Sequence, residues 1–188
     1  MSYSMRQGDK RGPEVDLHDF TYDGEVHGGI LSGGLGQLTD WEEGNYNFRL
    51  DQRGQGKKGY EWVGWKNDTS NVTSSLPVEI NFRFGHVRNF TAIRIHANNF
   101  FSKEVSVFRG VVVQFSVGGL YLSDEVLYFE YMKDTLIEIA RHIVIPVPHR
   151  LGRLVRLTFV FEAKWIMISE IRFDSGESLG VVSCEVIS

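Results

Sequence analysis

Apolar and polar side chains alternate along the C-terminal half of the chain. Residues 78–84 place Val78, Ile80, Phe82 and Phe84 on one face, with polar side chains between them. An alternation with a period of two is typical of a strand that buries one face and exposes the other. The pattern therefore predicts a strand in this segment, packed against a hydrophobic core.

Further segments carry strand patterns. The alternation recurs in residues 91–97, 111–117 and 154–162, and an apolar run over 166–173 is interrupted by a Ser-Glu pair. Residues 136–147 are ambiguous, although Pro146, the following Pro148 and a β-branched run favour a strand from about His142 onwards. Since no long segment has a convincing 3.6-residue period, the chain is predicted to be all-β. Short strands separated by polar turns indicate a β-sandwich or jelly roll, with any functional chemistry in the end loops.

The N-terminal part is less regular. Residues 1–15 are polar and contain glycine and proline, which predicts a flexible lead-in or linker. Residues 16–77 are rich in loops, and residues 176–188 look like a tail. In residues 28–36 the glycines match no phosphate-loop pattern, so we expect a tight hairpin or a bulge with positive φ.

Composition limits the class of protein. The chain has 188 residues and a formal net charge of -4, which argues against nucleic acid as the main partner. It has no apolar run of about 18 residues and so no expected membrane span. A lone cysteine, Cys184, cannot form an internal disulfide, which on its own favours a reducing compartment. The first residues lack a signal peptide's apolar core, so we expect a cytosolic chain or a piece of a larger one.

The six histidines show no metal-binding spacing, and with one cysteine a structural zinc site is not expected. We interpret them as surface or strand-edge residues, with His96 on the outward face of its strand. No nucleophile motif such as GxSxG is present, although a triad of distant residues stays open as the basis of a hydrolase.

An acidic cluster of Asp40, Glu42 and Glu43 does not follow an EF-hand pattern. It is either a solvated loop or part of a calcium site assembled from distant loops. Calcium takes about six to eight hard oxygens, and Gln37, three residues before Asp40, could supply one. Glu170 stands in an apolar strand, where a carboxylate is costly unless it is paired, bound to metal or turned outwards.

Three N-x-[ST] sequons begin at Asn67, Asn71 and Asn89. If they are glycosylated, the domain lies outside the cell. The aromatic stretch 59–65 is interpreted as core or rim packing more readily than as a ligand platform.

Several segments read together resemble one family. They are TYDG (21–24), GGLGQLTD (33–40), GYEWVGW (59–65), residues 80–99 and the W-x-x-x-SEIRF stretch over 165–173. In order and spacing they resemble the second extracellular domain of the discoidin domain receptors, which are collagen-activated receptor tyrosine kinases.

The resemblance implies a jelly-roll-like β-sandwich of the discoidin, or galactose-binding-like, type over residues 16–174. Residues 1–15 would then lead in from a preceding discoidin domain, and residues 175–188 would be a juxtamembrane-side linker or tail. The resemblance also implies a bound Ca²⁺. Its ligands, by side chain, by backbone carbonyl or from the adjoining loop, would come from Gln37, Asp40, Ser169, Glu170, Glu42, Tyr60, Trp62 and the loop near His18.

The chain departs from the vertebrate members of the family. They have a small or apolar residue at the position of Glu42 and a tyrosine at that of Trp62. If the site uses backbone carbonyls at these positions, both changes are harmless, and Glu42 could add a carboxylate. If it needs the tyrosine hydroxyl, Trp62 cannot replace it. They also have cysteines at three positions that are apolar here: Ala97, Val113 and Leu157. The resemblance therefore implies hydrocarbon packing in place of disulfides, and it removes the cysteine count as a guide to compartment.

By this resemblance the chain is expected to be no enzyme, but a module on the extracellular side of the plasma membrane. The parent single-pass receptor would bind collagen through the preceding domain, and this module would support that domain, contact other receptor domains and relay activation, in a parent that could act as a homodimer. An alternative is a carbohydrate- or glycoprotein-binding jelly roll with Tyr60, Trp62 and Trp65 as its stacking platform.

Overall fold

A computed structural model describes residues 1–51, 56–67 and 77–177 of the chain. These residues form strands and two short 3-10 helices, η1 (Gln37–Thr39) and η2 (Phe101–Lys103). The strands are β1 (Ser2–Arg6), β2 (Lys10–Arg11), β3 (Val15–Asp16), β4 (Glu25–His27), β5 (Ile30–Gly34), β6 (Val63–Lys66), β7 (Val78–Ala97), β8 (Gly110–Ser116), β9 (Leu127–Glu130), β10 (Arg141–Val160) and β11 (Trp165–Glu177).

The hydrogen-bonded order of the large sheet is β4-β5-β1-β7-β10-β8-β9, with β11 pairing β7 and β6 pairing β11. Every ladder within it is antiparallel. β2 and β3 form a separate two-stranded sheet. The all-β sandwich expected from the sequence is confirmed.

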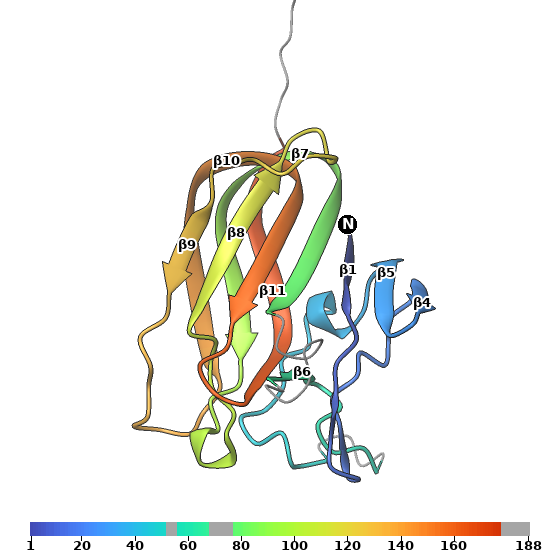
Figure 1. Ribbon diagram of the computed structural model, residues 1–188, viewed down its shortest axis with the longest axis vertical. Helices are drawn as coiled ribbons and strands as arrows, with labels where there is room; N and C mark the ends of the chain where they lie inside the picture. The colour runs from blue at the N-terminus through green and yellow to red at the C-terminus, as the bar shows by residue number, and fades with distance from the viewer. Residues whose placement is uncertain (52–55, 68–76, 178–188) are drawn as a thin grey trace, which may run out of the picture.

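Two long strands, β7 and β10, each run through both layers of the sandwich (Figure 1). The first part of β7 pairs with β1 and with the last part of β10, which also pairs with β8. The last part of β7 pairs with the first part of β10 and with β11. The register between β7 and β10 is irregular between Pro146 and Arg150, where β10 bends. The two strands predicted over 78–84 and 91–97 are therefore one strand that changes layer.

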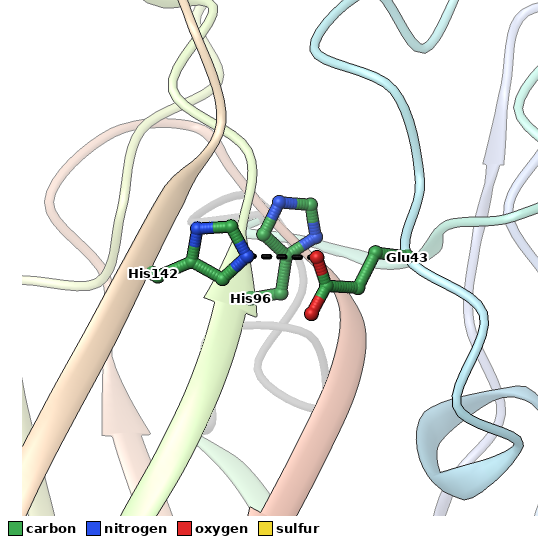
Figure 2. Close-up of side chains that lie close together, drawn as sticks. All are labelled: Glu43, His96 and His142. Carbon is green, nitrogen blue, oxygen red and sulfur yellow. Dashed lines mark hydrogen bonds and ion pairs between the residues drawn. The ribbon is translucent and has the colours of Figure 1, made fainter.

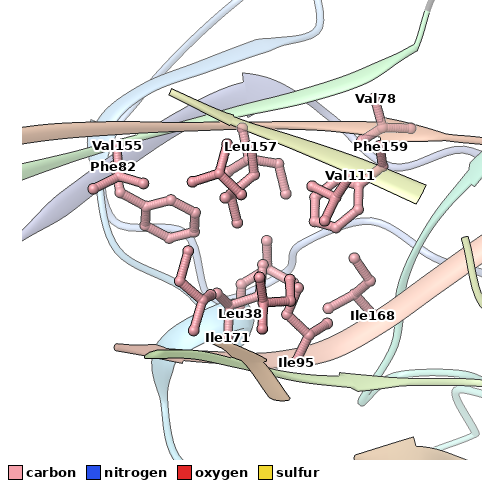
Figure 3. Close-up of a cluster of buried hydrophobic side chains, with 14 of the residues drawn as sticks. Leu38, Val78, Phe82, Ile95, Val111, Val155, Leu157, Phe159, Ile168 and Ile171 are labelled. Atoms are coloured by element: carbon pink, nitrogen blue, oxygen red, sulfur yellow. The ribbon is translucent and has the colours of Figure 1, made fainter. Parts of the chain in front are cut away.

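The main core lies between these layers. Figure 3 shows Phe82, Val155 and Phe159 on one side, facing Ile95 and Ile171 on the other. The four apolar side chains predicted to face inwards in 78–84 are all buried, whereas Phe161 at the end of its strand is only partly buried. The three apolar residues at the family's cysteine positions lie in this core: Ala97, Val113 and Leu157.

The N-terminal residues correct the expectation of a linker. β1 lies between β5 and β7 in the large sheet, and Tyr3 on it is fully buried. Tyr3 packs against Tyr22 and Phe82 with ring centroids 5.2 and 5.7 Å apart. The polar composition concealed a strand because only Tyr3 and Met5 of β1 point into the core.

The glycine-rich segment forms the predicted hairpin. Gly28 and Gly29, with φ of 57° and 78°, make the turn between β4 and β5. Positive φ at both turn positions is the conformation that favours glycine.

At the other end, β11 continues to Glu177 and so takes up the first residues of the expected tail. Residues 178–188, which include Cys184, lie outside the described part of the chain. None of the helices in the described part has the length and apolar character to cross a membrane.

Candidate functional site

The Ser-Glu interruption in the last strand is a β-bulge. Ile168 lies opposite Ala97 and Glu170 lies opposite His96, so Ser169 is an extra residue on β11. A bulge changes the direction of the side chains around it. Here it leaves both Ser169 and Glu170 buried beside the segment that follows η1.

Glu170 is a buried carboxylate in a partly compensated environment. The backbone N–H of Trp41 donates to Glu170 Oε2 over 3.0 Å, and Arg172 Nε lies 3.4 Å from Oε1. Burial nevertheless raises the pKa of Glu170 to about 7, and the negative charge of Asp40 adds to this effect. Close to neutral pH, the structure therefore holds this carboxyl between its two protonation states.

A second buried carboxylate, Asp19, belongs to the same region. It accepts hydrogen bonds from the Tyr3 hydroxyl and, over 3.0 Å, from the backbone N–H of Gln37. Burial is the main cause that raises its pKa, and the charge of Asp40 again contributes. Asp40 thus acts electrostatically on both buried acids.

The Gln37 side chain joins two more loops to this region. Its Oε1 accepts the backbone N–H of Phe20 over 2.7 Å, and its Nε2 donates to the backbone carbonyl of Tyr60. Hydrogen bonds and charge therefore link polar groups from four separate segments: Asp19, Gln37 with Asp40, the Tyr60 carbonyl, and Glu170.

These groups are of the chemical kinds that a hard cation takes as ligands. Carboxylate, amide and backbone carbonyl oxygens are the ligands that calcium prefers. Carboxylates that raise one another's pKa in a buried place are relieved by a bound positive charge.

The other predicted ligands make contacts of their own. Glu42 is exposed, and it is its backbone N–H that donates to Asp40, over 2.9 Å. His18 Nδ1 lies 3.2 Å from Asp16, while the Tyr60 ring stacks on Phe20. The Trp62 indole is fully buried and donates to the Asn45 carbonyl over 3.1 Å.

Ser169 points towards a different group. Its Oγ accepts the backbone N–H of Gly44 over 3.0 Å and shares a hydrogen bond of 2.7 Å with His96 Nδ1. Sequence reasoning missed Asp19, which lies one residue beyond the expected His18; its only signal was that position.

His96 corrects the prediction of an outward, solvated histidine. Its ring is stacked between Trp62, at a centroid distance of 5.3 Å, and His142, at 4.5 Å, and only 6% of the residue is exposed. The segment after η1 covers this part of β7. Burial lowers the pKa of His96 to about 4, with a further contribution from His142, so the ring is neutral at physiological pH.

The two histidines and Glu43 form a compact group (Figure 2). His142 is the direct cross-strand neighbour of His96 on β10, and its Nε2 lies 2.7 Å from Glu43 Oε2. Arg172 approaches the other carboxylate oxygen of Glu43 to 3.2 Å. Burial alone would raise the pKa of Glu43, but the hydrogen bond and charge of His142, and the charge of Arg172, hold it below its ordinary value.

The predicted sequons are placed only in part. Asn67 is described and its N–H donates to the Lys164 carbonyl over 2.8 Å, but Asn71 lies outside the described residues. Asn89 is within β7, opposite Leu151 on one side and Gly176 on the other. Glycosylation at all three stays a prediction.

The fold defines an all-β sandwich module, and comparison of the chain with known proteins gives its family. Residues 1–175 match the family model described as "Discoidin domain-containing receptor 1/2, DS-like domain". The chain belongs to this family, and it is a discoidin-like domain of a receptor kinase, as the sequence motifs suggested.

Two curated relatives show the same relation. The chain is 34% identical to discoidin domain-containing receptor tyrosine kinase B of Caenorhabditis elegans over 179 residues, which are 94% of this chain and 21% of that protein. It is 35% identical to the human epithelial discoidin domain-containing receptor 1 over 162 residues, 86% of this chain and 17% of that protein. The chain thus spans about a fifth of the length of these relatives.

Among solved structures, a fucose-binding module of Streptococcus pneumoniae superposes with a TM-score of 0.45. The sequences are 8% identical, and the match covers 88% of this chain and 98% of that chain. At this TM-score the likeness adds nothing to the family assignment.

Proposed function

We propose that this chain is an extracellular, calcium-binding module of a collagen receptor tyrosine kinase. It performs no catalysis itself. It supports the collagen-binding domain of the same receptor and relays activation towards the membrane. Collagen is a partner of the full-length receptor, and a homodimeric parent is compatible with this role.

One observation carries the calcium part of the proposal. Asp19, Asp40 and Glu170 come from distant segments, and the two buried members of the group have raised pKa values. Gln37 donates to the Tyr60 carbonyl through its side chain and to Asp19 through its backbone N–H. When bound there, Ca²⁺ would neutralise the repulsion between the acids and join the N-terminal loops to the closing strand.

The consequence is a structural role. The positions at which vertebrate relatives would have cysteines are apolar here, so the domain has no disulfide there to stabilise it. A cation that binds only the folded chain would stabilise it by mass action. At a calcium concentration a hundred times the dissociation constant, this amounts to about 2.7 kcal/mol. For a domain of this size the melting temperature then rises by about 5–10 °C.

Calorimetric titration and thermal melts in calcium or EGTA test the proposal. We expect one Ca²⁺ per chain and a melting temperature that falls on chelation. Asp40→Asn and Glu170→Gln should each reduce both effects. Glu125→Gln is the matched control, since Glu125 is an exposed carboxylate that pairs with Arg150 far from the acidic group. Identical melts with and without chelator would refute the calcium site.

The carbohydrate-binding alternative loses its platform. Trp62 and Trp65 are both fully buried, so neither ring can stack on a sugar at the surface. The hydrolase alternative gains no support from the described residues, because His96 contacts Ser169 at a position covered by Gly44 and Trp62.

A further inference from the structure

Glu43, His96 and His142 offer nitrogen and oxygen atoms of the kind that bind a borderline-soft divalent metal such as zinc. One ligand atom from each residue lies within 4.8 Å of the other two. Zinc binds imidazole nitrogen at about 2.0–2.1 Å and carboxylate oxygen at about 2.0–2.2 Å. Two such ligands on one tetrahedral ion are therefore about 3.3 Å apart, a spacing that small side-chain rotations bring about.

The scaffold holds these ligands in place. His96 and His142 are neighbours across the β7–β10 ladder, so the backbone fixes the spacing of the two imidazoles. Ser169 Oγ and the Trp62 indole fix the ring of His96. Partners of this kind orient the histidines of metal sites. Glu43 comes from the opposite side, and its hydrogen bond with His142 already brings two ligand groups to 2.7 Å.

The structure also shows how an ion could reach these three residues and which nearby charge would oppose it. A cavity of about 260 Å³ borders all three residues, and His142 is largely exposed, so an ion can enter from solvent and keep one coordination position for water. Arg172 opposes the ion, because its guanidinium lies 3.2 Å from Glu43. The same guanidinium also contacts Glu170 and lies over the Trp41 ring, at 4.7 Å from the centroid. It therefore keeps two other partners if the ion takes its place on Glu43.

We propose that Glu43, His96 and His142 form a second metal site that binds a zinc-class divalent cation and clasps the loop after η1 onto β7 and β10. The ligand chemistry separates it from the acidic group, where only oxygen donors meet. The site does not depend on calcium binding, although Glu170 borders both places.

The test is a zinc titration of the chain in saturating calcium, using a competing chromophoric chelator. Cobalt is used in parallel as a coloured substitute for zinc. We expect one saturable zinc per chain. His142→Ala and Glu43→Gln should each weaken binding by about tenfold or more, and His142→Ala should abolish the visible cobalt bands.

Two control variants make the result specific. His27→Ala alters another exposed histidine that lies next to a carboxylate, 3.6 Å from Glu25, but in the β4–β5 hairpin. Asp40→Asn alters the acidic group. Both should bind zinc as the unaltered chain does.

The proposal is overturned by any of three results: no saturable zinc site, unchanged affinity in His142→Ala, or an equal loss in His27→Ala. An equal loss in Asp40→Asn would place the zinc among the acidic residues and overturn it too. A calcium titration of the same variants reports on the acidic group alone, so the calcium proposal and the zinc proposal can be refuted independently.

Discussion

Replacing Glu170 by glutamine should remove one pH-dependent contribution to the stability of the calcium-free domain. The pKa of Glu170 rises from the ordinary 4.5 to about 7 in the folded chain, mainly through burial. The folded state therefore holds this proton more tightly than the unfolded state. The stability that protonated Glu170 contributes is complete below pH 4.5 and is lost as the pH rises through 7.

The magnitude follows from the two pKa values. Each pH unit between them is worth about 1.4 kcal/mol, so the whole interval corresponds to about 3 kcal/mol, of which about 2 kcal/mol falls between pH 5 and pH 7.5. Burial of His96 has the opposite sign, since its lowered pKa costs stability as the pH falls. This contribution is common to both proteins and cancels in their difference.

The assay is urea unfolding in EGTA at pH 5 and pH 7.5. Relative to the unaltered chain, Glu170→Gln should gain about 2 kcal/mol in free energy of unfolding over this range. In saturating calcium at pH 7.5 the variant should be less stable than the unaltered chain, because it lacks a ligand. Glu125→Gln should show no relative gain, since the pKa of Glu125 is already lowered by its hydrogen bond with Arg150. If the free energy of unfolding in EGTA changed equally with pH in the unaltered chain and in Glu170→Gln, the reasoning would be refuted.

Three further predictions concern packing. Leu157→Ala should lower the free energy of unfolding by about 2–5 kcal/mol, because it opens a cavity in the main core; a loss below 1 kcal/mol in urea melts would contradict its burial. Deleting residues 1–6 should lower the melting temperature, because β1 and the buried Tyr3 are lost, whereas a true linker could be removed without change. Trp62→Ala should destabilise the domain by about 3–5 kcal/mol in urea melts, and unchanged stability with altered glycan-array binding would restore the platform hypothesis.

The periodicity of the chain predicts the main strands, but it does not predict that two of them are parts of one long strand, β7. Residues 78–84 alternate because one face of β7 meets the core, and this local rule needs no knowledge of partners. The same strand then crosses to the other layer, where Trp62 and the bulge at Ser169 contact the outer side chain of His96, and the inward-outward rule no longer identifies exposed residues. His96 was misplaced for this reason.

The candidate site divides in the same way. A carboxylate in an apolar strand signals an unusual environment, so Glu170 could be identified from the sequence. Its neighbour Asp19 could not, because burial of that carboxylate depends on β1, which the polar N-terminal composition concealed. The meeting of Glu43 with His142 depends on the register of β10 and on the course of a distant loop, and neither is encoded in local spacing.

β7 pairs with strands from both ends of the described chain, and this arrangement has a mechanical consequence. Its first part is hydrogen-bonded to residues 2–5 of β1, and its last part is hydrogen-bonded to residues 168–177 of β11. A load applied across these two strands, which lie near opposite ends of the described chain, therefore passes along the covalent backbone of β7. It does not have to pass through side-chain contacts between the layers. Tension applied at β1 would therefore reach β11 through hydrogen-bonded backbone alone.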